Sequence, residues 1–301
     1  MSLDLHQHLW PEPFLHALRA RTRPPRLDGW TLVLYGESFE IDPAAHDPAR
    51  RAAQAAADGL ELAGVAPSAA LGIDRLPAAE AAELAAAWLD GALELPAPFR
   101  PWCTAGFERP DPAALEDALE RGALGLELAA DALAAHGAPA RLAPLLDVLE
   151  AAGAPVFVHP GPTSGSATAG RPAWWAPTVP YVAQLHAAWW AWADGGRDRH
   201  PGLLICFAAL AGLGPLHGER QRARGGEDHP VDARTFVETS CYGTQAVDAV
   251  IRALGVDVVC HGSDRPYAEP AELALDPAAL HAIRRTNPAR LLARVLERVP
   301  A

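Results

Sequence analysis

The chain begins with an apolar run that ends in two histidines. Residues 3–8 read Leu-Asp-Leu-His-Gln-His, which places His6 and His8 two positions apart. In a β-strand, alternate side chains project from the same face. Two imidazoles on one face at the end of a strand can together bind one divalent metal, each through one ring nitrogen. Pairs of this kind also arise by chance, so the motif needs partners elsewhere in the chain.

Two later apolar runs supply such partners. Residues 155–159 end in His159, and residues 256–262 are followed two positions later by Asp264. Three neutral imidazoles and one carboxylate suit a zinc site that leaves positions for water or a substrate. An isolated histidine is more often an ordinary buried or rim residue, but four matched strand-end positions together favour a metal site.

The elements that must position these residues alternate along the whole chain. Most of the strand-like runs are continuously apolar, as in a parallel sheet that is buried on both faces, and they lie at residues 3–8, 60–66, 99–106, 123–128, 155–159, 203–208, 235–241 and 256–262. Segments with helical period lie between and after them, at residues 47–58, 77–93, 111–121, 139–152, 180–193, 215–224, 244–254 and 277–297. This alternation predicts an α/β fold, a closed (β/α)8 TIM barrel with a single domain over residues 1–301. All strand ends of such a barrel meet at one rim, which brings the four candidate ligands together.

Two segments depart from the alternation. Residues 23–46 predict an insertion after the first strand, in the form of a small hairpin. Residues 160–178 predict a long loop directly after the fifth strand. A loop of this length after a barrel strand lies over the mouth of the active site and is a candidate lid.

Composition limits the class of protein. The net charge is −12 with a sequence pI near 5.4, and no stripe of basic residues is present, which argues against nucleic acid as a partner. The longest apolar stretch, residues 203–216, is interrupted by glycines and is too short to span a membrane. The first residues lack the pattern of a signal peptide. Four cysteines without CxxC spacing predict reduced core thiols in a cytoplasmic protein, with Cys241 a weaker candidate for lining a pocket.

The motifs resemble those of the amidohydrolase superfamily, in the branch that contains aminocarboxymuconate-semialdehyde decarboxylase and related lactonases. The matching segments are Asp-Leu-His-Gln-His-Leu-Trp at residues 4–10, Val-Phe-Val-His-Pro-Gly at 156–161, Gly-Ser-Asp-Arg-Pro-Tyr at 262–267 and Asn-Pro-Ala-Arg-Leu-Leu at 287–292. The resemblance implies a metal-dependent TIM-barrel enzyme in which His6, His8 and His159 are metal ligands. It also implies that Asp264 is both a ligand and the carboxylate that handles protons.

The chain departs from this family at one position. The sixth strand of the family usually ends in a histidine that binds a second metal or contacts the reacting group, and Ala209 stands there in this sequence. The end of the fourth strand, residues 125–128, also lacks the lysine that bridges two metals in binuclear members. A single divalent metal, zinc by the type of its ligands, is therefore expected. Glu127 is a formal alternative bridge for a second ion, although a packed glutamate is the preferred interpretation.

Other residues are candidates for contacting a small-molecule substrate. Trp10, just past the paired histidines, offers an aromatic face, and Arg265 offers a planar donor fork or, equally, a salt bridge at the rim. His261 lies on the eighth strand. His186 lies in a helix-like segment, as does His217, where a packed or solvated histidine is the commoner outcome.

Five tryptophans crowd residues 174–192. Neighbours on a helix point about 100° apart, so Trp189, Trp190 and Trp192 cannot all be buried on one face. We expect some of them to pack under the lid or against another subunit, which predicts a homo-oligomer.

The sequence thus predicts a metal-dependent hydrolase of a small carboxylate-like or cyclic substrate, such as a lactone or amide. A bound metal lowers the pKa of its water towards 7, and Asp264 would act as general base and then general acid. The first alternative is a metal-dependent non-oxidative decarboxylase, a lyase, which the same branch contains. The second alternative is a catalytically silent barrel that binds a metal or a ligand.

Overall fold

The computed structural model describes residues 2–168, 170–227 and 232–298. Within them, parallel strands form a central ring: β1 (Leu3–His8), β5 (Leu62–Ala66), β6 (Phe99–Pro101), β7 (Leu126–Ala129), β8 (Val156–His159), β9 (Ile205–Phe207), β10 (Thr235–Glu238) and β11 (Val259–Cys260). They pair in the orders β1-β5-β6 and β11-β10-β9-β8-β7. Single bridges from Cys103 to Leu126 and from Gln7 to Arg265 close the ring. The predicted (β/α)8 TIM barrel is therefore confirmed.

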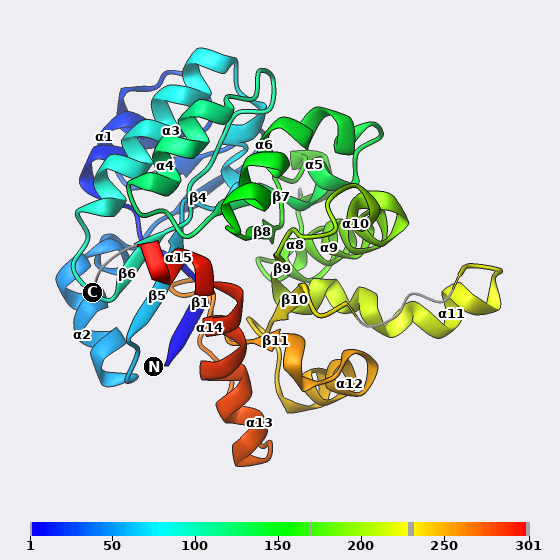
Figure 1. The fold of residues 1–301 in the computed structure, drawn as a ribbon. Coiled ribbons are helices and arrows are strands. Elements are labelled where there is room, and N and C mark those ends of the chain that lie inside the picture. Colours follow the sequence, from blue (N-terminus) through cyan, green and yellow to red (C-terminus); the bar gives the residue numbers. More distant parts are fainter. Residues whose placement is uncertain (1, 169, 228–231, 299–301) are drawn as a thin grey trace.

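Helices surround the strands (Figure 1). In chain order they are α1 (Glu12–Ala20), α2 (Pro48–Ala57), α3 (Ala78–Leu93), α4 (Pro112–Glu120), α5 (Ala130–Ala134), α6 (Ala138–Ala152), α9 (Pro180–Ala191), α10 (Arg197–Arg199), α11 (Gly218–Ala223), α12 (Thr244–Leu254), α13 (Pro277–His281), α14 (Asn287–Leu291) and α15 (Ala293–Arg298). Asp111 and Asp276 cap α4 and α13 with their side chains, each before a proline at the first helical position. No helix among the described residues is long and apolar enough to cross a membrane.

The structure also contains short 3₁₀ and π-helical turns. The 3₁₀ turns are η1 (Pro43–His46), η2 (Ala69–Leu71), η3 (Ile73–Arg75), η5 (Ala209–His217) and η6 (Val256–Val258). The π turns are η4 (Trp192–Gly196) and η7 (Ala282–Thr286), and they extend α9 and α13. Most of these turns lie between a strand and the next helix, where the backbone changes direction.

Two excursions, which are segments inserted after barrel strands, contact each other. The insertion after β1 forms a small antiparallel sheet of β2 (Arg26–Asp28), β3 (Thr31–Val33) and β4 (Ser38–Glu40), one strand more than the predicted hairpin. The segment after β8 carries two short helices, α7 (Gly165–Thr168) and α8 (Trp175–Thr178), and its residue 169 lies outside the described residues. Glu37 Oε1 accepts hydrogen bonds from the hydroxyls of Thr163 and Thr168, at 3.2 and 2.5 Å, which ties the two excursions together.

Aromatic rings fill the barrel interior beneath the histidines. Trp102 stacks on Phe157 with ring centroids 5.2 Å apart, and Phe157 lies 5.0 Å from the ring of His6. The indole nitrogen of Trp102 donates to the Leu5 carbonyl at 2.9 Å. A Cβ on Gly64 would lie 2.7 Å from that nitrogen, so glycine makes room for the indole. This packed layer supports the end of β1 from below.

Candidate metal centre

The four predicted ligands converge at the carboxyl ends of β1, β8 and β11. One ligand atom from each of His6, His8, His159 and Asp264 lies within 4.8 Å of the others. The Nε2 atoms of His6 and His8 are 3.1 Å apart, and Asp264 Oδ1 lies 3.3 and 3.2 Å from them. The three imidazole rings pack edge to face with centroids 5.0 to 5.1 Å apart. Within the described part of the chain, this is the cluster whose geometry suits a metal ion.

Each imidazole is oriented by an acceptor on its outer side. Nδ1 of His6 lies 3.0 Å from Glu238 Oε1, and Nδ1 of His8 and of His159 each faces a backbone carbonyl oxygen, at 3.0 and 2.9 Å. An acceptor at Nδ1 assigns the hydrogen to that nitrogen and leaves the Nε2 lone pair directed at the centre of the cluster. Ligating histidines are held in this way in metalloproteins.

This donor set fits a divalent cation. Two imidazole lone pairs 3.1 Å apart repel each other unless a positive charge lies between them and the carboxylate. Burial lowers the pKa of His6, but Asp264 and Glu238 outweigh burial and raise it to about 9. Burial, followed by the neighbouring imidazole of His6, holds the pKa of His159 well below its usual range. The cluster therefore favours one positive charge, which a proton or a metal can supply.

The strand end that carries His6 and His8 is locked by polar side chains. The pairing of β1 with β5 shifts in register between Asp4 and Gln7, and Asp4 Oδ1 accepts the His6 backbone N–H at 3.0 Å. The buried Arg51 donates to the His8 carbonyl at 2.9 Å and to Gln7 Oε1 at 2.5 Å. These bonds satisfy the backbone groups that the irregular ladder leaves free, and they hold both imidazoles in place.

The end of β9 has an unusual backbone. From Ala209 to Leu213 every φ lies between 46° and 61°, which is one turn of left-handed helix. Such a turn costs about 1–2 kcal/mol for each residue that is not glycine. Ala209 N–H donates to Glu238 Oε1 at 2.8 Å, so the turn is tied to the carboxylate that orients His6. Ala209, where the family histidine was expected, thus lies beside the candidate ligands.

Glu127 lies near the cluster but is not one of its members. It is buried on β7, and its Oε1 accepts from the Ala69 N–H at 2.9 Å and lies 3.9 Å from His159 Nδ1. Burial raises the pKa of Glu127 to about 8. The 25 basic residues of the chain are all arginine, so a carboxylated lysine bridge is excluded. These observations favour the single-metal interpretation.

Two residues that the sequence analysis did not single out lie near the cluster. The ring of Tyr267 lies 5.3 Å from that of His8, yet 51% of Tyr267 is exposed. Burial, with the negative charges of Glu37 and Asp264, raises the pKa of Tyr181 to about 12. Glu238 was also missed, although a charged residue inside an apolar run was a signal for it.

Trp10 and Arg265 are held by other groups of the protein. Trp10 is 1% exposed, stacks on His46 with ring centroids 4.7 Å apart and donates to a backbone carbonyl. Its ring thus packs in the core, and its predicted contact with a substrate stays a prediction. The buried guanidinium of Arg265 pairs with Asp58 and Glu269, which is the salt-bridge alternative.

His261 and His186 lie outside the ligand cluster. His261 follows β11, and its backbone joins neighbouring segments by donating to the Ile283 carbonyl and accepting from the Leu5 N–H. His186 packs against His217 with ring centroids 4.8 Å apart, between α9 and η5. Their proposed contact with a substrate remains a prediction.

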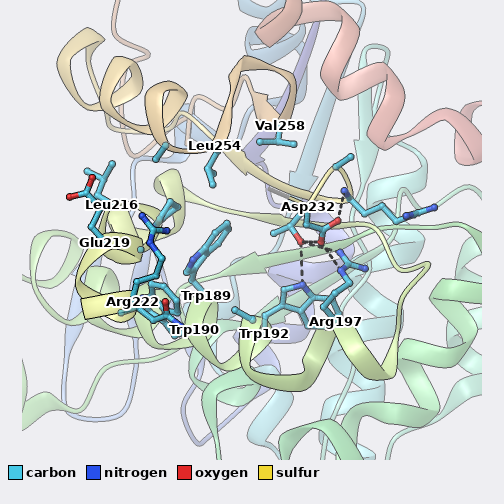
Figure 2. Close-up of a pocket in the computed structure, with 18 of the residues that line it drawn as sticks. Trp189, Trp190, Trp192, Arg197, Leu216, Glu219, Arg222, Asp232, Leu254 and Val258 are labelled. Atoms are coloured by element: carbon cyan, nitrogen blue, oxygen red, sulfur yellow. Dashed lines mark hydrogen bonds and ion pairs between the residues drawn. The ribbon is translucent and has the colours of Figure 1, made fainter. Parts of the chain in front are cut away.

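A cavity of about 860 Å³ lies elsewhere, among α9, α11 and α12 (Figure 2). Trp189, Trp190 and Trp192 line it, and Trp192 donates from its indole nitrogen to Thr235 Oγ1 at 3.3 Å. Thr235 begins β10 and Val258 precedes β11, so this cavity borders the amino ends of the strands. The active sites of TIM barrels lie at the opposite rim, where the four candidate ligands are.

The fold is shared with solved structures of enzymes. A crystal structure of Metarhizium anisopliae IDCase in apo form matches with a TM-score of 0.78 and 16% identity over 99% of this chain and 98% of that one. The 5-carboxyvanillate decarboxylase of Sphingomonas paucimobilis matches with a TM-score of 0.72 and 18% identity over 97% and 98% of the two chains. A dihydroxybenzoic acid decarboxylase from a Polaromonas species, with bound manganese and the inhibitor 2-nitroresorcinol, matches with a TM-score of 0.69 and 19% identity over 99% and 98%. No protein-family profile and no curated protein matches the chain. The chain thus shares its fold with these solved structures.

Proposed function

We propose that this protein is a metal-dependent decarboxylase of the amidohydrolase type, acting on a small aromatic carboxylate. The proposal places the lyase ahead of the hydrolase that the sequence alone favoured. It rests on a candidate three-histidine, one-aspartate metal site in a barrel that matches solved decarboxylases over nearly the whole length of both chains. Fold likeness alone would be a weak argument for activity, and the cluster supplies the chemistry.

In this proposal His6, His8, His159 and Asp264 hold one divalent ion, zinc or manganese. The bound ion would draw electron density from a carboxylate or hydroxyl oxygen of the substrate and stabilise negative charge there. The exposed ring of Tyr267 would lie against the flat face of an aromatic substrate, next to His8. These assignments explain why an exposed aromatic residue adjoins buried ligands.

Asp264 would carry the proton in this reaction. Although burial raises the pKa of Asp264, the imidazoles of His6 and His8 outweigh burial and hold it well below its usual range. Its second oxygen, Oδ2, is the one that does not face those two histidines. During decarboxylation the bond from the ring carbon to the carboxylate carbon would break, CO2 would leave without that electron pair, and Asp264 would pass a proton taken from solvent water to the ring carbon.

Hydrolysis is the second candidate, and Ala209 favours it. Decarboxylases of the resembled branch tend to place a histidine near the substrate at this position, and the described side chains of the ligand cluster include none from β9. A lactone or amide would be attacked by water, with Asp264 as the base.

One experiment separates these candidates. The purified chain, loaded with Mn²⁺ or with Zn²⁺, is incubated with 2,6-dihydroxybenzoate, 5-carboxyvanillate, simple lactones and aryl amides. We expect CO2 release from a hydroxylated aromatic acid. Acid release from a lactone or amide, without CO2, would assign the hydrolase instead, and silence across the panel would favour a binding barrel.

We also propose that the chain forms a homo-oligomer. Trp174 is 59% exposed and Val179 41%, both on the segment that runs from β8 into α9. Exposed apolar side chains near each other in one segment can be covered by a partner. Light scattering at micromolar concentration tests this, and a monomer mass would contradict it.

A further inference from the structure

Cys241 lies against the carboxylate of Asp264. Its Sγ is 3.4 Å from Asp264 Oδ2, within hydrogen-bonding distance for a thiol donor. The two residues follow β10 and β11, which pair with each other in the barrel. Asp264 Oδ1 faces His6 and His8, so the thiol contacts the oxygen on the other side of the carboxylate.

Both residues sit in tight turns. Cys241 has φ 64° and Asp264 has φ 61°, which lie in the left-handed region that residues other than glycine seldom adopt. The Tyr242 N–H donates to the Thr239 carbonyl at 3.1 Å, and the Tyr267 N–H donates to the Asp264 carbonyl at 2.9 Å. These bonds close the two turns and direct the two side chains toward each other.

Cys241 differs from the other cysteines. Cys103, Cys206 and Cys260 are buried in the core, whereas Cys241 is exposed. Its sulfur is also not among the atoms that cluster within 4.8 Å of one another. The thiol is therefore placed on the open side of Asp264, as a neighbour of the ligand cluster and not as a member.

We propose that Cys241 is a positioning residue for the metal centre. Its S–H donates to Asp264 Oδ2 and fixes the rotation of the carboxylate, so that Oδ1 faces the metal and Oδ2 faces the substrate side. Ligating carboxylates in metalloproteins are commonly held by such outer hydrogen bonds. The inference rests on the metal role of Asp264 in the proposed function.

The test compares the wild-type chain with Cys241→Ser and Cys241→Ala, each loaded with Co²⁺ as a spectroscopic probe. Serine keeps a hydroxyl donor, and alanine removes the donor. We expect Cys241→Ala to shift the d–d absorption of the bound cobalt and to weaken Co²⁺ binding by about threefold to tenfold, and Cys241→Ser to restore both. Tyr242→Phe, which changes the adjacent residue without touching Asp264, is the matched control and is expected to behave as wild type.

Three results would overturn the inference. One is a Cys241→Ala protein with the spectrum and the cobalt affinity of wild type. Another is a sulfur-to-cobalt charge-transfer band in wild type, because that band would make Cys241 a ligand. The third is a wild-type chain that binds no cobalt.

A second measurement remains informative if the alanine variant folds poorly. Because burial and the Asp264 carboxylate raise the pKa of the Cys241 thiol, iodoacetamide at neutral pH should modify this exposed cysteine more slowly than a free cysteine, and the modified protein should show the altered cobalt spectrum. Modification of Cys241 that leaves the spectrum unchanged would contradict the role. A cobalt response without decarboxylation of any panel substrate would retain this inference and reject the proposed activity, so the two failures are distinguishable.

Discussion

Oε1 of Glu238 lies 3.0 Å from Nδ1 of His6, and both side chains are buried. The same carboxylate accepts from Ala209 N–H and from both the hydroxyl and the backbone N–H of Ser240. One side chain thus fixes a candidate ligand and the turn after β9 at the same time. A charged acceptor also makes His6 a more basic ligand than an imidazole held by a carbonyl.

Replacing Glu238 by Gln tests this relationship. The amide keeps an acceptor oxygen but loses the negative charge, so we expect metal affinity to fall by about 10- to 100-fold with the fold retained. Competition with a chelator measures the affinity. Glu12→Gln, an exposed change on α1, is the control. Equal affinities for the two variants would remove Glu238 from the metal site.

The metal assignment is tested by stoichiometry. The purified protein should bind about one divalent metal per chain, and His6→Ala or His8→Ala should abolish binding because each removes a ligand. His16→Ala, at an exposed position on α1, should bind like wild type. Metal analysis after dialysis gives the result, and full retention in both cluster variants contradicts the assignment.

Asp264→Asn separates binding from proton transfer. Asparagine keeps the shape and one oxygen ligand but cannot accept the proton, so we expect near-normal folding with kcat lowered by about a hundredfold or more. Activity is measured on the substrate that the panel identifies, and circular dichroism monitors the fold. An unchanged kcat would assign proton transfer to another residue, with His261 the next to replace.

The buried carboxyl group of Asp74 leads us to expect that the stability of the fold depends on pH. Both of its carboxylate oxygens are buried without a hydrogen-bond partner among the described residues, and burial raises its pKa to about 6 from 3.8. Well below pH 4 the group is protonated in both states. As the pH rises to 6 the unfolded chain loses this proton first, so stability falls by up to about 3 kcal/mol and then stays low.

Asp74→Asn should therefore remove this loss. We expect the variant to be more stable than wild type at pH 8, by about 1–2 kcal/mol, and nearly equal to it at pH 4. Urea unfolding at the two pH values measures the difference. A variant that is destabilised equally at both would show that the ionised carboxylate is not the cause.

Gly212 tests the left-handed turn. A Cβ at this position would lie 2.4 Å from the Val182 carbonyl oxygen, and φ is 58°. Gly29 has almost the same φ, 61°, with nothing within 4 Å of its Cβ position. We expect Gly29→Ala to cost about 1 kcal/mol and Gly212→Ala more than about 3 kcal/mol in the free energy of unfolding. Equal destabilisation of the two variants would show that the contact between the added Cβ and α9 relaxes without a loss of stability.

The barrel and its ligand cluster were predictable because they depend on period and position. Each of the eight apolar runs overlaps a barrel strand, and the ends of those strands must meet at one rim. The boundaries were less predictable, since the run at 99–106 yields a strand only over Phe99–Pro101. Beyond the end of a strand, backbone hydrogen bonds go to loops instead of to neighbouring strands. The hydrophobicity of the residues does not mark the position at which this happens.

The surroundings of the site could not be read from the sequence. Trp10 follows the paired histidines directly, yet its ring turns into the core because His46, from the far end of the insertion, stacks on it. Helix α1 was missed because it lies inside the region where the chain first leaves the barrel. Glu238 and Tyr267 contact histidines that are distant in sequence, and although a charge inside an apolar run marks Glu238, no local pattern gives the partner of either residue.

The closure of the ring has a consequence for biosynthesis. Asp4 Oδ1 accepts from the Ser263 N–H, and His6 O accepts from the Asp264 N–H, so the first strand is completed by residues some 260 positions later. During synthesis a growing chain therefore contains His6 and His8 long before it contains Asp264 and the last strand. Contacts of such long sequence separation form late and slow folding. If the four candidate residues bind an ion as proposed, binding by the full set would report that the barrel has closed, and the ion would be a marker of completed folding.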